Sequence, residues 1–139
     1  MKYQRFHDKV IIRIDKGEEI VSTLKHLCTQ LDMKLGSIIG IGATNDATIG
    51  LMNTTTRTYK STRFTDDYEI SSLVGNITTM DGEVYLHLHV TICDQELNTY
   101  GGHLSSAVVS ATFEGIITLI KGQLDRTKDP SIGLNLLNL

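Results

Sequence analysis

The chain opens with a regular alternation of apolar and polar positions. In the segment 2–14 one side carries apolar residues and the other carries polar ones; the apolar residues are Phe6, Val10, Ile12 and Ile14. Successive side chains of a β-strand point to opposite faces, so a period of two residues is typical of a half-buried strand. The pattern predicts a strand over 2–14 with one face in the core.

The spacing of apolar residues then changes to that of a helix. Between residues 17 and 32 they recur at intervals of three and four, at Ile20, Val21, Leu24, Leu27, Cys28 and Leu31. Glu18 and Glu19 fall in the first turn, where the helix dipole favours a negative charge. We therefore expect an α-helix over about 17–32.

Residues 35–53 indicate two strands joined by a turn at 44–46. Gly40 and Gly42 lie on one sheet face and leave that face bare. Glycine within a strand often marks a close approach, so a helix or a ligand is expected over this face. The polar segment 54–67 is expected to form a loop or an edge ribbon.

The strongest turn signal in the chain is the dipeptide Asp81-Gly82, which separates two strand-like segments. Asp-Gly between such segments is typical of a two-residue β-hairpin. Residues 107–122 are apolar and β-branched and favour a buried strand, with a helix as the alternative for the first half. The tail beyond Pro130 is apolar, and its leucines are expected to pack down: Leu134, Leu136, Leu137 and Leu139.

One early helix followed by many strands predicts the α+β class, with a largely antiparallel β-sheet packed against the helix. A doubly wound parallel sheet needs helices that alternate with strands, and this chain lacks that alternation. At 139 residues, the whole chain 1–139 is most simply a single domain.

Composition and charge narrow the function classes. The chain has 13 Lys and Arg against 16 Asp and Glu, a net charge of −3, and its basic residues are scattered. That is a weak basis for binding nucleic acid, which depends on clustered cations. Arg57, Lys60 and Arg63 with Tyr59 offer one candidate nucleic-acid edge, but a solvated ribbon explains them better.

The two cysteines form no short pair and indicate reduced thiols. No apolar segment approaches the length of a membrane span or a leader peptide. We therefore expect a cytoplasmic protein that does not contact a membrane.

The segment 84–93 carries the chemistry of most interest. Its alternation places five aliphatic residues on the core face, and Tyr85, His87, His89, Thr91 and Cys93 on the other. Two residues along a strand span roughly 7 Å. Two imidazoles can bridge that gap to one ion at about 2.0–2.1 Å from each nitrogen.

His103 is the candidate third ligand, because the two preceding glycines let the backbone turn sharply and expose the ring. Three histidines with an open fourth position are typical of a catalytic or ligand-exchanging zinc site. Cys93 lies about 13 Å beyond His89 along the strand and is expected not to share the metal. The alternative is that the histidines form only the polar side of a half-exposed sheet.

Other motifs are weak or absent. Asp94, Glu96 and Glu114 are candidate carboxylate neighbours of the metal, with a surface role as the alternative for Asp94 and Glu96. The segment "GIGATN" at 40–45 lacks the third glycine of a dinucleotide loop and is followed by no helix. No serine-nucleophile, P-loop, HExxH or Cys–His catalytic signature is present.

Several motifs together carry a resemblance to a known family. "SIIGIGATNDATIG", "YEISSLVGNI", "GEVYLHLHVTI" and "GGHL" ahead of "FEGIITL" resemble the PPC domain, conserved in plants and prokaryotes, over nearly the whole chain. The resemblance implies an α+β fold that assembles as a homotrimer. It also implies that His87, His89 and His103 bind a divalent metal, with zinc expected.

The same resemblance bears on partners. Plant members carry a basic AT-hook for A·T-rich DNA, and this chain has no such hook, so DNA is only weakly supported as a partner. The segment "YEISSL" resembles the family's partner-contact segment and suggests a surface at Tyr68, Glu69, Ile70 and Leu73.

Three functions follow, in order of preference. The first is a metal-binding, oligomeric binding module with a regulatory or DNA-binding role. The second is a metal-dependent enzyme that acts on an unknown small-molecule substrate, with Glu114 or Tyr100 as the acid or base. The third is a trimer interface in which the histidines hold no ion.

Overall fold

The structure is a computed structural model that describes residues 1–139. It contains a helix, α1 (Ile20–Gln30), and nine strands. The strands are β1 (Lys2–Phe6), β2 (Lys9–Asp15), β3 (Gly36–Asn53), β4 (Thr58–Phe64), β5 (Tyr68–Met80), β6 (Glu83–Cys93), β7 (Thr99–Leu119), β8 (Arg126–Lys128) and β9 (Asn135–Leu137). The α+β class and the mostly antiparallel sheet are confirmed.

Seven strands form one antiparallel sheet in the order β1-β2-β7-β6-β5-β3-β4. The two longest strands, β3 and β7, also pair with each other, so the sheet closes on itself through β3, β5, β6 and β7. Register shifts interrupt this pairing at three places and allow both long strands to bend. Strands β8 and β9 form a separate hairpin.

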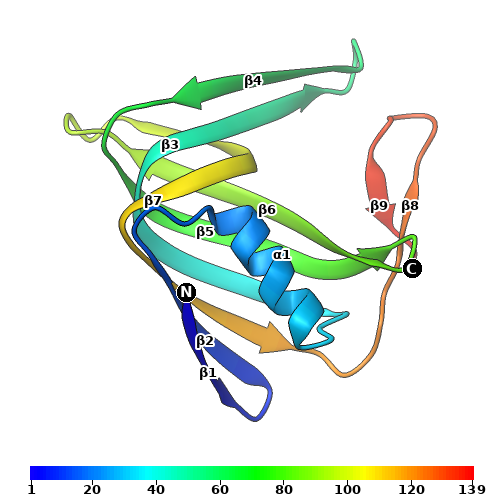
Figure 1. The fold of residues 1–139 in the computed structure, drawn as a ribbon. Coiled ribbons are helices and arrows are strands. Elements are labelled where there is room, and N and C mark those ends of the chain that lie inside the picture. Colours follow the sequence, from blue (N-terminus) through cyan, green and yellow to red (C-terminus); the bar gives the residue numbers. More distant parts are fainter.

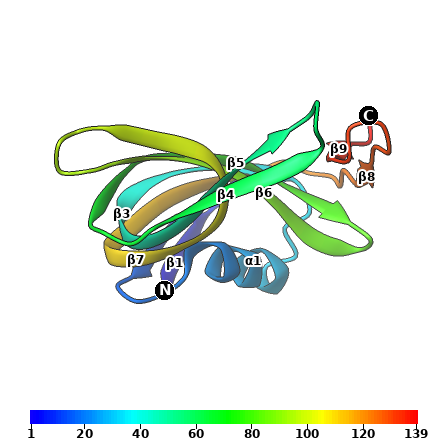
Figure 2. The same cartoon turned by 90° about the horizontal axis from the view of Figure 1, so that it is seen from above.

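The ends of three hairpins gather on one side of the molecule. Figures 1 and 2 both show the β3–β4 turn, the β5–β6 turn and the β8–β9 hairpin at the same end of the sheet. An isolated β-bridge joins Thr79, near the end of β5, to Asp125, the residue before β8. This end of the molecule contains the candidate site described below.

The helix covers one face of the sheet at β6 and β7 (Figure 1). Its buried residues, Ile20, Leu24, Leu27 and Cys28, all belong to the predicted apolar stripe, whereas Val21 and Leu31 of that stripe are only partly buried. They join a core of 22 buried residues that includes Phe113 of β7, which is fully inaccessible to solvent. With 11 residues, α1 is too short to cross a membrane, and the chain has no other helix.

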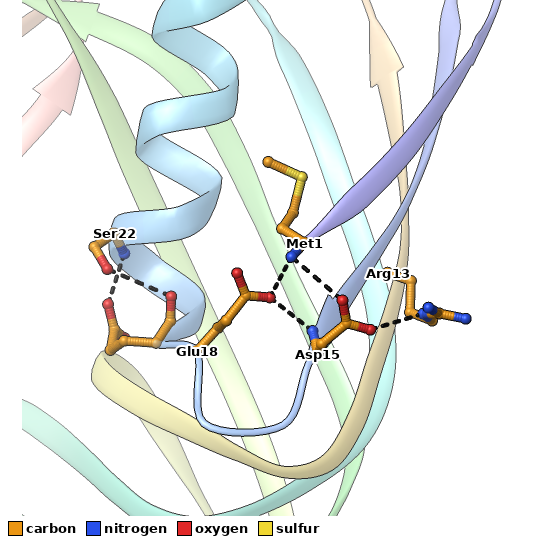
Figure 3. A network of polar contacts seen from close by, with 6 residues as sticks. Met1, Arg13, Asp15, Glu18 and Ser22 are labelled. Atoms are coloured by element: carbon orange, nitrogen blue, oxygen red, sulfur yellow. Dashed lines mark hydrogen bonds and ion pairs between the residues drawn. The ribbon is translucent and has the colours of Figure 1, made fainter.

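The helix begins later than the charge pattern predicts. Glu19 is the N-cap, and its carboxylate accepts hydrogen bonds from the backbone N–H groups of Val21 and Ser22 at 2.9 and 2.7 Å. Glu18 lies before the helix, where its carboxylate pairs with the N-terminal ammonium at 2.5 Å and accepts a hydrogen bond from the backbone N–H of Asp15 (Figure 3). The predicted range 17–32 is therefore too long at both ends.

The predicted strand over 2–14 is a hairpin. Phe6 pairs with Lys9 across a two-residue turn in which His7 has a positive φ of 53°. Val10 and Ile12 of the returning strand are buried as predicted, but Phe6 is 50% exposed. Periodicity alone missed the turn because the alternation continues across it: Phe6 and Val10 are four residues apart and so have the same parity.

Residues 36–53 form one long strand, so the turn predicted at 44–46 is wrong. Thr44 lies at bulges in the pairing with β7, where its hydroxyl donates to the carbonyl of Val108 at 2.7 Å. The bare face at Gly40 and Gly42 is covered by the neighbouring strand. A Cβ at either glycine would collide with β7, including the ring or backbone of Phe113. The close approach was predicted correctly, but its partner is a strand rather than a helix or a ligand.

The hairpin at Asp81-Gly82 is confirmed, with positive φ at both residues and Met80 paired with Glu83. Segment 54–67 contains the edge strand β4, in agreement with the ribbon alternative. The last sheet strand begins at Thr99 rather than near 107. In the tail, residues 134–137 face a pocket, whereas Leu139 is fully exposed and does not pack as expected.

Candidate metal centre

Two adjacent strands bring the three histidines together. His87 and His89 share one face of β6, and His103 of β7 is the direct cross-strand partner of His89. On the opposite face of β6, Leu88, Val90 and Ile92 are at most 3% exposed. The predicted parity is therefore observed, and the histidines lie outside the core.

The three rings form a compact triangle. Their centroids are 5.2 to 5.8 Å apart, and one nitrogen from each ring lies within 4.8 Å of the other two. Zn–N bonds of about 2.0–2.1 Å in a tetrahedral site place ligand nitrogens roughly 3.3 Å apart. Small side-chain rotations close this difference, so the three residues fit a tetrahedral ion with one position left open.

The electrostatic setting favours neutral rings. Burial lowers the pKa of both His87 and His103, and the positive charge of Arg126 lowers that of His87 further. Neutral imidazole is the form that binds a metal, so protons compete weakly here at neutral pH. His89 is the most exposed of the three and places the cluster at the protein surface.

The glycines before His103 have a different role from the one predicted. Residues 101 and 102 lie inside β7, and His103 pairs with Gly50 of β3 on its other side. A Cβ on Gly102 would lie 2.6 Å from the carbonyl oxygen of Gly50. These glycines therefore allow the strands to approach closely rather than making a sharp turn, and the ring is presented from a regular strand.

The cluster opens into a pocket of about 650 Å³. Apolar side chains form much of its wall, and they come from β3 and from the C-terminal segment: Leu51, Met52, Leu134, Leu136 and Leu137. Tyr59, Tyr85 and Arg126 supply polar groups, and the lining contains no carboxylate. Sequence reasoning did not find Arg126, because nothing in the local pattern of "QLDRTKDP" distinguishes it from a surface cation.

The other candidates lie away from the three histidines. Cys93 is outside the cluster, as predicted, and its thiol approaches Ser71. Asp94 organises the β6–β7 turn, where it accepts a hydrogen bond from the hydroxyl of Tyr100 at 3.1 Å. Glu114 is exposed on β7 and lines a different hollow. Neither Tyr100 nor any of the three candidate carboxylates, Asp94, Glu96 and Glu114, lines the pocket.

The expected partner segment is only partly accessible. Ile70 is 1% exposed and Leu73 is fully buried, so both belong to the core. Tyr68 is half-buried and Glu69 is exposed. The surface that a partner can touch in this segment is therefore centred on Tyr68 and Glu69.

The basic edge on β4 has one paired cation, Arg63, whereas the exposed Arg57 and Lys60 form no ion pair. Arg63 forms a bidentate ion pair with Asp46 at 2.7 and 2.8 Å, and this pair holds the pKa of the Asp46 carboxyl below its ordinary value. Tyr59 turns toward the histidines, with its ring edge-on to His103 at 6.2 Å between centroids. The strand is an exposed ribbon, and its aromatic residue belongs to the pocket.

Comparison with known proteins gives relatives over the whole chain. The chain is 35% identical to a candidate DNA-binding protein from Bacteroides thetaiotaomicron, with a TM-score of 0.96 over 99% of this chain and 96% of that one. It is 28% identical to a metal-containing protein from Archaeoglobus fulgidus, with a TM-score of 0.87 over 99% of both chains.

A curated relative, the bifunctional protein GlmU of a Synechococcus strain, is 28% identical over 125 residues. Those residues are 88% of this chain but 18% of that protein, so this chain spans about a fifth of its length. The family model of the Plants and Prokaryotes Conserved domain, abbreviated PCC or PPC, matches residues 1–121. The chain belongs to the Plants and Prokaryotes Conserved domain family.

Proposed function

We propose that this protein is a metal-binding module in which His87, His89 and His103 hold one divalent ion, with zinc the preferred metal. The observation that carries the proposal is the convergence of three imidazole nitrogens within 4.8 Å at the mouth of a pocket. Imidazole ligands suit zinc, and a closed structural site would have four protein ligands. The metal-containing relative from Archaeoglobus fulgidus supports the same assignment.

An enzyme is the second candidate, favoured by the open coordination position beside a pocket of about 650 Å³. A zinc ion there would supply a Lewis acid or an activated water. The predicted acid–base residues, Glu114 and Tyr100, do not line the pocket, so proton transfer would fall to Tyr59 or Tyr85. The absence of a carboxylate beside the histidines makes a binding role the preferred function.

Assembly as a homotrimer is part of the proposal. Exposed aliphatic side chains gather on the sheet around a hollow of about 540 Å³: Ile11, Ile39, Ile41, Val74 and Ile116, each 39–61% exposed. An apolar patch of this kind is typical of a protein interface. A smaller groove continues from Ile39 and Val74 to His87 and His89, so a second subunit seated here would border the metal site.

A regulatory role through partners or DNA in the cytoplasm completes the proposal. The Bacteroides relative supports DNA as a partner, whereas the net charge of −3 and the Arg63–Asp46 pair weigh against broad phosphate contact. A gel-shift assay at about 150 mM salt with A·T-rich and random duplexes tests this part. No shift at micromolar protein removes DNA, and the surface at Tyr68 and Glu69 then becomes the expected contact for a protein partner.

The decisive experiment for the metal is elemental analysis of protein purified without a histidine tag. We expect about one zinc per chain in the wild type and almost none in the His87→Ala, His89→Ala double variant. His26→Ala is the matched control, because His26 is exposed on α1 and should leave the metal content unchanged. A wild type with well under one metal per chain would contradict the proposal.

A further inference from the structure

Arg126 is a buried cation without an anionic partner. Arg126 is 7% exposed, and none of the ion pairs in the chain involves it. The pocket that it lines contains three histidines and no carboxylate. Burying an uncompensated charge is costly, so such a residue usually faces a ligand of opposite charge.

The protein holds this guanidinium in one orientation. Its Nε donates to the hydroxyl of Thr78 at 2.9 Å, and its Nη1 donates to the backbone carbonyl of Asn135 at 2.8 Å. The guanidinium also lies over the ring of Tyr85, 5.1 Å from the ring centroid, and the Tyr85 hydroxyl accepts from the Asn135 amide. Nη2 has no acceptor within the chain, so its N–H groups are available to a ligand in the pocket that Arg126 lines.

The position of Arg126 relative to the histidines suits a small ligand. Tyr85, on which the guanidinium stacks, and His87 lie two residues apart on the same face of β6, a span of roughly 7 Å. A molecule of a few carbon atoms can join these points. The leucines of the β8–β9 hairpin and the end of β3 supply an apolar wall for its body.

We propose that Arg126 is the anchor of a carboxylate-binding site, and that the ligand is a small monocarboxylate with an apolar body lying between the guanidinium and the three histidines. A planar guanidinium matches a carboxylate through two parallel hydrogen bonds. A phosphate dianion would require more donors than a single arginine in a largely apolar pocket. The metal half of this site rests on the proposed function, but the Arg126 half does not.

The anchor belongs to a part of the chain that the family model does not cover. The family model ends at residue 121, whereas Arg126, Asn135 and the pocket leucines of the C-terminal segment lie beyond that residue. The histidines therefore lie within the family domain, and the group that would select the ligand comes from the C-terminal hairpin.

The test compares 4-methylpentanoate with its neutral isostere 4-methylpentanamide, by calorimetry or ligand-detected NMR. Both are titrated into EDTA-treated protein and into zinc-loaded protein. We expect the acid to bind and the amide to bind at least tenfold more weakly in both preparations. This comparison needs no substitution, so it holds even if a variant of a buried residue fails to fold.

The variants then assign the preference to one residue. Arg126→Gln should weaken binding of the acid about 10- to 100-fold, the range expected for losing hydrogen bonds to a charged group, and leave the amide unchanged. Lys128→Gln is the control, because Lys128 is an exposed cation on the same strand and should have no effect. Equal binding of acid and amide, or a folded Arg126→Gln protein with unchanged affinity, overturns the inference.

Two outcomes separate this inference from the metal proposal. If the protein takes up no metal but the EDTA-treated form still prefers the acid through Arg126, the metal proposal fails and the inference stands. If zinc binds but the acid is not preferred, the inference fails alone. Inorganic phosphate, titrated in parallel, overturns the choice of a carboxylate if it binds more tightly than the acid.

Discussion

Zinc should stabilise the folded chain, because the three histidines converge only after β6 and β7 have paired. His103 lies 14 residues beyond His89, so an unfolded chain does not hold the three ligands together. A ligand that binds only the native state raises the free energy of unfolding by an amount set by its concentration relative to Kd. The perturbation is therefore the addition of zinc to metal-free protein.

The size of the effect follows from chain length and mass action. Free zinc at 100 times Kd adds about 2.7 kcal/mol to the free energy of unfolding. An unfolding entropy of about 2.1 cal/mol/K per residue gives the 139-residue chain a total of about 0.3 kcal/mol/K near its melting point. The ratio of these values predicts a rise in Tm of about 9 °C.

Thermal unfolding followed by circular dichroism measures this shift, with EDTA-treated protein as the baseline. His26→Ala should retain the full rise, since that residue is exposed on α1 and far from the site in the sheet. His103→Ala removes one of three donors and should lose most of the rise. An equal shift in His103→Ala and His26→Ala would refute the argument, because it would show that zinc stabilises the protein through some other site.

Three further predictions test the core and the start of the helix. Burial raises the pKa of the Cys28 thiol to about 12, so iodoacetamide at pH 8 should alkylate only Cys93 in the native protein, as counted by intact mass; modification of both thiols would contradict this. The hydrogen bond with the N-terminal ammonium lowers the pKa of the Glu18 carboxyl in the folded state. The ionised Glu18 therefore stabilises the protein fully above the unfolded-state pKa of about 4.3, and this stabilisation is lost as the pH falls through the lower folded-state pKa. Urea unfolding should therefore show Glu18→Gln less stable than wild type at pH 7 and nearly equal at pH 3. Gly40→Ala should destabilise the protein by about 1–3 kcal/mol because its Cβ meets the ring of Phe113, and a double-mutant cycle with Phe113→Ala should recover much of that loss; additive effects would mean that the ring is not the obstacle.

The sequence predicted those features that depend on local periodicity. The parity of β6 assigned the aliphatic residues to the core and His87 and His89 to the other face, and both assignments are observed. The Asp81-Gly82 turn was also correct, because its positive φ angles suit these two residue types. Both signals reside in a few neighbouring residues and need no information about the rest of the fold.

The errors arose where distant segments decide the local structure. The segment around Thr44 contains polar residues typical of a turn, yet pairing with β5 and β7 keeps β3 continuous, with bulges absorbing the irregularity. Gly40 and Gly42 correctly indicated a close approach, but only the β3–β7 pairing identifies Phe113 as the neighbour. A glycine can indicate that another part of the chain packs closely against it, but it does not indicate which segment, here some seventy residues away, does so.

The pocket shows the same division between local and distant information. The strand alternation that revealed the histidines has no counterpart at Arg126, which lies in a strand of three residues within a polar segment. Its burial depends on Thr78 and Tyr85 of the β5–β6 hairpin and on Asn135 of the returning tail. Because the metal ligands come from the sheet and the cation comes from a separate hairpin, ligand preference can change through the tail while the three histidines stay in place. The Arg126→Gln and His103→Ala variants should therefore have separable effects, the first on carboxylate affinity in metal-free protein and the second on the zinc-dependent rise in Tm.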